Sequence, residues 1–259
     1  MSEPPQTYLL LCVAALAAGV INSLAGGGTL LTFPALGRYI SDLAANVTNT
    51  VALVPGSLAG AWGYHRELWA SRRWVLLLIG PSLAGGLAGS LLLTQFPEEY
   101  FEKVVPWLIL GATLLFIAQP SLSRWAILRT HAAAPSTLGL ALMAVFQFFV
   151  AIYGGYFGAG MGILMLSTLG LMGVSDIHKM NAVKSFLAAC INGISVAVFI
   201  IDGRVAWRFA APMAVCAVAG GYVGARIARR LNRNLVRWIV VAIGLGLSVY
   251  YFLAKYGHA

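Results

Sequence analysis

The chain has 259 residues, of which 60% are hydrophobic and 10% are charged, and its mean hydropathy is +0.84. Soluble domains carry about 25% charged residues, so this composition excludes a soluble globular protein. The formal net charge of +9 arises from 17 Lys and Arg residues that stand in short clusters between apolar segments, so no nucleic acid partner is expected. The sequence predicts a polytopic integral membrane protein.

Ten apolar segments follow one another along the chain, at residues 8–24, 29–40, 44–64, 74–94, 104–119, 137–157, 160–172, 179–201, 207–228 and 235–254. A helix needs roughly 20 apolar residues to cross the hydrocarbon core of a bilayer. The second and seventh segments are too short for this, and each follows a cluster of glycines. The N-terminus has neither a basic region nor a cleavage site, so we expect the first segment to be retained.

The two short segments belong to an internal repeat. Aligning the glycine clusters sets the Ser-Asp pair at 41–42 opposite the Ser-Asp pair at 175–176. The helices that follow then begin with matching polar residues. We predict two repeats, residues 1–118 and 137–259, joined by a linker at 119–136. Each would be a glycine-broken or re-entrant helix pair followed by three transmembrane helices, giving an all-α fold of the kind found in secondary transporters.

The basic residues predict that the two repeats are inverted. Short cytoplasmic loops are enriched in Lys and Arg, so we place the loops around 65–73 and 226–237, and the linker, in the cytoplasm. The acidic loop at 98–103, which is equivalent by repeat to the loop at 226–237, would lie outside. Both termini would then be periplasmic, and we expect a multi-pass protein of the bacterial inner membrane.

The glycine breaks predict a substrate site. Unsatisfied amides in lipid cost several kcal/mol each, so broken helices at membrane depth mark a cavity. The N-terminus of the helix after each break presents free N–H groups, which favour an anion. Close helix packing is the alternative role for these glycines. The candidate substrate-binding residues are Gly26, Gly27, Gly28, Thr29, Asn46, Asn49, Thr50, Gly158, Gly160, Gly162, Asn181, Lys184, Ser185 and Asn192.

Lys184 is the basic residue deepest within an apolar segment, about 10 Å from its cytoplasmic end. A charge at this depth is a functional hypothesis by default, and the alternative is that its side chain snorkels to the interface. All eight acidic residues fall in loops or at segment ends, which disfavours a cationic substrate. No nucleophile with a base, carboxylate pair or metal motif stands out, so no enzyme, metal or cofactor is expected.

Five stretches in this order resemble the sulfite exporter TauE/SafE family, also called the toluene sulfonate uptake permease family. They are AGGGTLLTFPALG, NVTNT, GGYFGAGMGILML, NAVKS and GGYVGARIARRLN. The resemblance covers nearly the whole chain and implies transport of sulfur-containing oxyanions or organosulfonates. It places the family's polar pairs at Thr48-Asn49 and Val183-Lys184. Thr50 stands where many relatives carry a lysine, so this chain has a single cation in the two pairs.

We therefore expect a secondary carrier that exports sulfite, sulfoacetate or a related organosulfonate by rocking one repeat against the other. A proton or a sodium ion would be the coupling ion, and a homodimer is compatible with the sequence. Two alternatives stay open. One is a membrane subunit or scaffold that delivers sulfur compounds to a partner protein, and the other, ranked last, is an intramembrane enzyme.

Overall fold

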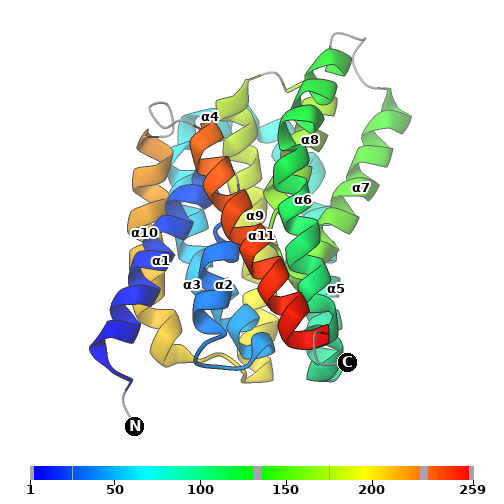
Figure 1. The fold of residues 1–259 in the computed structure, drawn as a ribbon. Coiled ribbons are helices and arrows are strands. Elements are labelled where there is room, and N and C mark those ends of the chain that lie inside the picture. The colour runs from blue at the N-terminus through cyan, green and yellow to red at the C-terminus, as the bar shows by residue number, and fades with distance from the viewer. Residues whose placement is uncertain (1–2, 25, 131–135, 175, 228–232, 257–259) are drawn as a thin grey trace.

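The structure is a computed structural model that describes residues 3–24, 26–130, 136–174, 176–227 and 233–256. Within these ranges the chain forms eleven helices and no strand (Figure 1). The first half contains α1 (Pro5–Leu24), α2 (Thr29–Leu36), α3 (Asp42–Gly63), α4 (His65–Ala70), α5 (Arg72–Gln95) and α6 (Glu98–Thr130). The second half contains α7 (Thr137–Tyr156), α8 (Met161–Leu171), α9 (Ile177–Asp202), α10 (Trp207–Ile227) and α11 (Arg233–Tyr256).

Seven of these helices are long and apolar enough to cross a membrane, namely α1, α5, α6, α7, α9, α10 and α11. Helix α3 has 22 residues but is less apolar, because polar residues such as Asn46 and Asn49 lie along it. Side chains on the outer faces of the bundle are large and hydrophobic, as lipid contact requires; examples are Leu76, Val215 and Leu253. The prediction of an all-helical membrane protein is therefore confirmed.

Two boundaries differ from the prediction. Helix α6 has 33 residues and continues to Thr130, so most of the predicted linker at 119–136 is helix, and residues 131–135 lie outside the described part. Residues 119–130 contain no glycine, and Pro120 alone does not end the helix. The short helix α4 between α3 and α5 was also not predicted.

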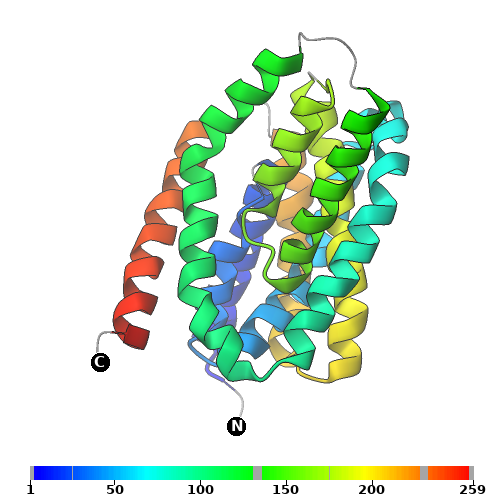
Figure 2. The ribbon, with the colours of Figure 1, turned by 90° about the vertical axis from the view of Figure 1, so that its right-hand side faces the viewer.

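Two helical hairpins enter the bundle from opposite ends. Helix α1 begins at the end that carries both termini, and α2 returns to that end (Figure 1). Helix α7 begins at the other end, beside the end of α6, and α8 returns there, so that the α7–α8 turn lies inside the bundle (Figure 2). This is the arrangement expected of inverted repeats, although the repeat relationship itself stays a prediction.

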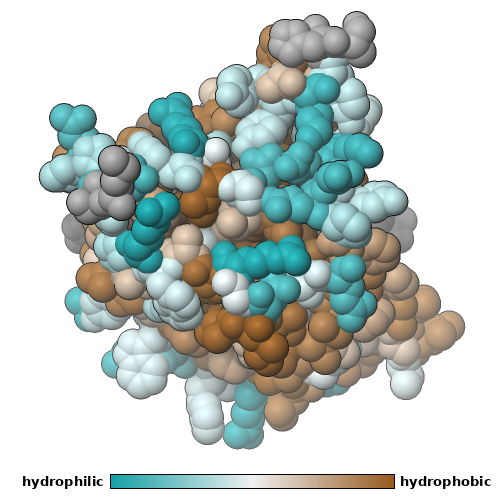
Figure 3. Space-filling model, turned by 90° about the horizontal axis from the view of Figure 1, so that it is seen from below, coloured by the Kyte–Doolittle hydropathy of each residue, from teal (hydrophilic) through white to brown (hydrophobic). Residues whose placement is uncertain are grey.

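Hydrophilic and basic segments are distributed unevenly between the two ends. Helix α4, the end of α6, the start of α7, the end of α10 and the start of α11 lie at the end opposite the termini (Figure 1). The acidic start of α6 lies at the end with the termini. At that end hydrophilic side chains gather over the middle, and hydrophobic surface extends along one flank (Figure 3).

Small residues allow the helices around the hairpins to pack backbone against backbone. A Cβ atom added at Gly220 of α10 would lie 2.1 Å from the carbonyl oxygen of Leu16 in α1. At the second hairpin, a Cβ atom at Gly89 of α5 would lie 2.0 Å from the carbonyl oxygen of Ile152 in α7. Such close contacts are typical of small residues between membrane helices. Here they fix each hairpin against a helix of the other half of the chain, α1 against α10 and α7 against α5.

Candidate anion site

The two glycine turns meet inside the protein. The amide of Gly160 donates a hydrogen bond to the carbonyl oxygen of Gly26 at 3.3 Å. Gly26 has a φ of 82°, and a Cβ atom there would lie 3.1 Å from the Cα of Gly162. Residues with a side chain rarely adopt this φ, so both the conformation and the close approach require glycine at position 26.

Helices α1 and α7 end in the same way. The amide of Gly26 donates to the carbonyl oxygen of Ile21 at 3.2 Å, and the amide of Gly158 donates to that of Tyr153 at 3.1 Å. Both glycines have positive φ values, as is common where a helix terminates. The side chain of Asn22 then accepts a hydrogen bond from the amide of Gly28 at 2.8 Å, which helps to direct the chain into α2.

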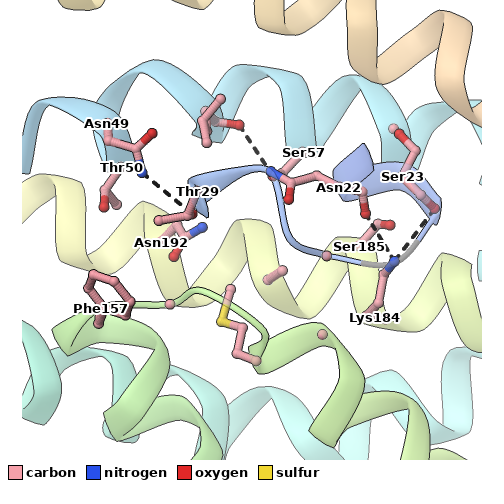
Figure 4. Close-up of a pocket in the computed structure, with 17 residues that line it drawn as sticks. Asn22, Ser23, Thr29, Asn49, Thr50, Ser57, Phe157, Lys184, Ser185 and Asn192 are labelled. Carbon is pink, nitrogen blue, oxygen red and sulfur yellow. Dashed lines mark hydrogen bonds between the residues drawn. The ribbon is translucent and has the colours of Figure 1, made fainter. Parts of the chain in front are cut away.

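A pocket lies where these turns face the antiparallel pair α3 and α9 (Figure 4). At one end of the pocket are Lys184, Ser185, Asn22 and Ser23, and at the other are Asn49, Thr50, Asn192 and Phe157 (Figure 4). The remaining lining residues are Gly26, Thr29, Leu53, Ser57, Gly60, Gly158, Met161, Gly162 and Ala188. The pocket is thus lined mainly by glycines, hydroxyl groups and amides.

Lys184 does not snorkel to the interface, because its side chain is only 1% exposed. Its ammonium nitrogen lies 3.0 Å from the carbonyl oxygen of Asn22 and 3.5 Å from that of Ser23. These carbonyls belong to the last turn of α1, the negative end of the helix dipole. Lys184 therefore links α9 to the broken end of α1 and places a positive charge on the pocket wall.

Asn49, which the predicted repeat aligns with Lys184, also bonds to the first hairpin. Its amide nitrogen donates to the hydroxyl oxygen of Thr29 at 3.4 Å, and its amide oxygen accepts a short hydrogen bond from the hydroxyl of Thr32. Both threonines belong to α2. The α1–α2 turn is therefore bonded on both sides. Asn49 of α3 bonds to residues of α2, and Lys184 of α9 bonds to residues of α1.

One polar group on the pocket wall has no hydrogen-bond partner among the described residues. It is the hydroxyl of Ser185, a residue that is only 4% exposed. Gly162, in the first turn of α8, also lines the pocket. Buried polar groups are normally paired, so the Ser185 hydroxyl, at the same end of the pocket as Lys184 (Figure 4), is suited to bind a ligand with acceptor oxygens.

Nine of the predicted site residues line the pocket: Gly26, Thr29, Asn49, Thr50, Gly158, Gly162, Lys184, Ser185 and Asn192. Five do not. A Cβ atom at Gly27 would meet the ring of Phe116, and one at Gly28 would meet Ala18. Gly160 precedes α8 as its N-cap. These three glycines therefore serve close packing and the turn itself, which was the alternative role considered for them.

The two remaining predicted residues, Asn46 and Asn181, are buried outside the pocket lining. Asn46 donates from its amide to the carbonyl oxygen of Tyr156 at 2.9 Å. No partner for the side-chain amide of Asn181 is found in the described part of the chain. Each lies four residues before a pocket residue, Thr50 and Ser185 respectively, so the two asparagines flank the site from opposite ends of the α3–α9 pair.

Several lining residues were missed by the sequence prediction, among them Asn22, Ser23, Ser57, Gly60 and Phe157. Two of them were detectable. Ser57 and Gly60 lie seven and ten positions after Thr50, a spacing that places all three on one face of a helix. Asn22 and Ser23 gave no such signal, because their role depends on where α1 ends.

None of the described residues that line the pocket is a carboxylate. Across the described residues, no group of three His, Cys, Asp or Glu side chains is placed to hold a metal ion. The chemistry of the pocket is therefore that of one buried ammonium, hydroxyl and amide groups and the N-terminus of α8. All of these favour an anion.

Comparisons with known proteins find relatives that are named as membrane transporters. The chain is similar to the probable membrane transporter protein ORF9 of Sinorhizobium sp., with 29% identity over 92% of this chain and 90% of the relative. A probable membrane transporter protein of Haemophilus influenzae is 28% identical over 93% and 92% of the two chains. The probable membrane transporter protein YfcA of Escherichia coli is 27% identical over 92% of this chain and 87% of the relative.

No solved structure matches the chain. The sequence pattern of the family described as sulfite exporter TauE/SafE, in contrast, matches residues 11–251, which include both glycine turns and all of the residues that line the pocket. The chain therefore belongs to the sulfite exporter TauE/SafE family of membrane transporters.

Proposed function

We propose that this protein is a secondary carrier for sulfur-containing anions, such as sulfite or an organosulfonate, and that it binds them where the two glycine turns meet. The observation that carries the proposal is the buried ammonium of Lys184 beside the unpartnered hydroxyl of Ser185 on the wall of one pocket. Oxyanions combine negative charge with several acceptor oxygens, so both groups suit them. The family name supports sulfite or a chemically related anion as the substrate.

The proposed mechanism uses the two hairpins as the moving parts. The hairpins enter from opposite ends and meet at the glycine turns and at the ring contact between Phe33 and Phe157. In the proposed mechanism one part of the protein rocks against the other around a site near the midplane. The contact between Gly26 and Gly160 would be the pivot. An anion bound beside Lys184 would then be exposed to each side of the membrane in turn.

We further propose that the end carrying both termini faces the periplasm of a bacterial inner membrane and that transport is outward. The positive-inside rule supports this orientation, because the basic connections lie at the opposite end. Outward transport is supported by the family name. A proton or sodium ion would supply the coupling.

The experiment is uptake of labelled sulfite, sulfoacetate and sulfate into proteoliposomes that contain only this chain, under an imposed proton or sodium gradient. We expect uptake of at least one sulfur anion that depends on a gradient and is absent from protein-free liposomes. A scaffold that delivers sulfur compounds to a partner would give no uptake in this assay. An intramembrane enzyme would alter the labelled compound, which analysis of the vesicle contents would detect.

A further inference from the structure

Within the pocket, the balance of charge sets a limit on the substrate. Among the described residues that line it, Lys184 is the single charged side chain. Its neighbours at that end of the pocket, Asn22, Ser23 and Ser185, are neutral (Figure 4). The opposite end contributes only the neutral side chains of residues such as Asn49, Thr50 and Asn192. The site therefore offers one positive charge to whatever it binds.

The surroundings of Lys184 do not compensate a second negative charge. The carbonyl oxygens of Asn22 and Ser23 point at the ammonium, and they are the negative end of the α1 dipole. A dianion would bring its second charge into a buried site beside these carbonyls. An uncompensated charge inside a protein costs several kcal/mol even after the structure relaxes.

The rest of α3 and α9 does not supply a second cation. Lys179, the other lysine of α9, is exposed near the start of the helix and does not line the pocket. Asp42, the acidic residue of α3, is the first residue of that helix and also lies outside the lining. The charge of Lys184 is therefore the one that a bound anion meets within the pocket.

We infer that the pocket selects anions by charge, so that the transported species is a monoanion, such as hydrogen sulfite or a singly charged sulfonate, and dianions are rejected. This inference rests on the proposed function, because it describes the same site. The inference distinguishes singly from doubly charged sulfur anions, which the family name does not, because sulfite and organosulfonates occur with one or two negative charges.

The test compares two anions of nearly the same size and shape, methanesulfonate with one charge and sulfate with two. Binding of each to the purified protein in detergent is measured by calorimetric titration at one pH and ionic strength. We expect methanesulfonate to bind at least roughly a hundredfold more tightly than sulfate. If sulfate binds as tightly as methanesulfonate, or more tightly, the inference is wrong while the proposed function stands. If neither anion nor sulfite binds, both are wrong.

A variant provides the converse test. Thr50 lines the pocket at the end opposite Lys184 (Figure 4), and its hydroxyl donates a hydrogen bond within its own helix, to the carbonyl of Asn46. In Thr50→Lys a second ammonium would enter the pocket, so we expect the preference for methanesulfonate over sulfate to fall by about tenfold or more. A folded variant whose preference is unchanged would overturn the inference. If this variant does not fold, the comparison in the unaltered protein decides.

Discussion

Replacing Lys184 by methionine removes the buried charge while keeping a long, flexible side chain. In the structure the ammonium bonds to the carbonyl oxygens of Asn22 and Ser23. Losing this donor costs stability of about 1–3 kcal/mol where a buried acceptor is left unpaired. The cost is offset because an apolar group replaces a buried charge, which is often neutral or stabilising. We therefore expect Lys184→Met to fold and to melt within a few degrees of the unaltered protein.

Anion binding should respond very differently to the same change. Removing one partner of a buried, hydrogen-bonded charge pair costs about 2–5 kcal/mol of binding free energy, so the Kd for methanesulfonate should rise at least about thirtyfold. The assay is calorimetric titration of both proteins in detergent, with the melting temperature measured in parallel. Lys179→Met is the matched control, because Lys179 is an exposed lysine of the same helix.

A Kd for Lys184→Met within about threefold of the unaltered value, in a protein that melts normally, would refute the assignment of Lys184 to the site. If Lys184→Met fails to fold while Lys179→Met folds, the main role of Lys184 is instead its bond to α1. In that case Lys184→Arg, which keeps the charge, should restore both folding and binding if the charge is used for both.

Three further changes test the turns, the hydroxyl and the packing. Gly26→Ala should abolish transport and lower the melting temperature, because its φ is positive and its Cβ would press on the second turn, whereas Gly80→Ala, at an open position in α5, should be harmless. Ser185→Ala should weaken binding by about fivefold without loss of stability. Ser195→Ala should do the reverse, since that hydroxyl bonds to backbone carbonyls away from the pocket; calorimetry and melting curves distinguish the two. Gly220→Ala should reduce the free energy of unfolding by about 1–3 kcal/mol or more by separating α1 from α10, as measured by denaturation in detergent.

Much of the fold could be predicted because the bilayer imposes simple rules on sequence. Long apolar segments predicted the membrane helices, and the glycine clusters predicted where α1 and α7 end. The length of α6 could not be predicted in the same way, because residues 119–130 are too polar for a span and yet continue the helix through Pro120. The six residues of α4 were missed for the same reason.

The site was predicted only in part because its chemistry depends on contacts between distant segments. Depth within an apolar segment identified Lys184 as a candidate, but its bond to Asn22 joins residues 162 positions apart. The glycine clusters were correctly recognised as turns. Tertiary packing decides which glycines face the pocket and which face Phe116 or Ala18. The repeat pattern in the sequence does not contain that information.

The most direct test of the central claim is a structure of the protein with bromomethanesulfonate, whose bromine is located by its anomalous scattering. The account predicts the bromine signal in the pocket between the two glycine turns, with sulfonate oxygens about 3 Å from the ammonium of Lys184 and the hydroxyl of Ser185. An anion bound elsewhere in the bundle, with this pocket empty, would contradict the account.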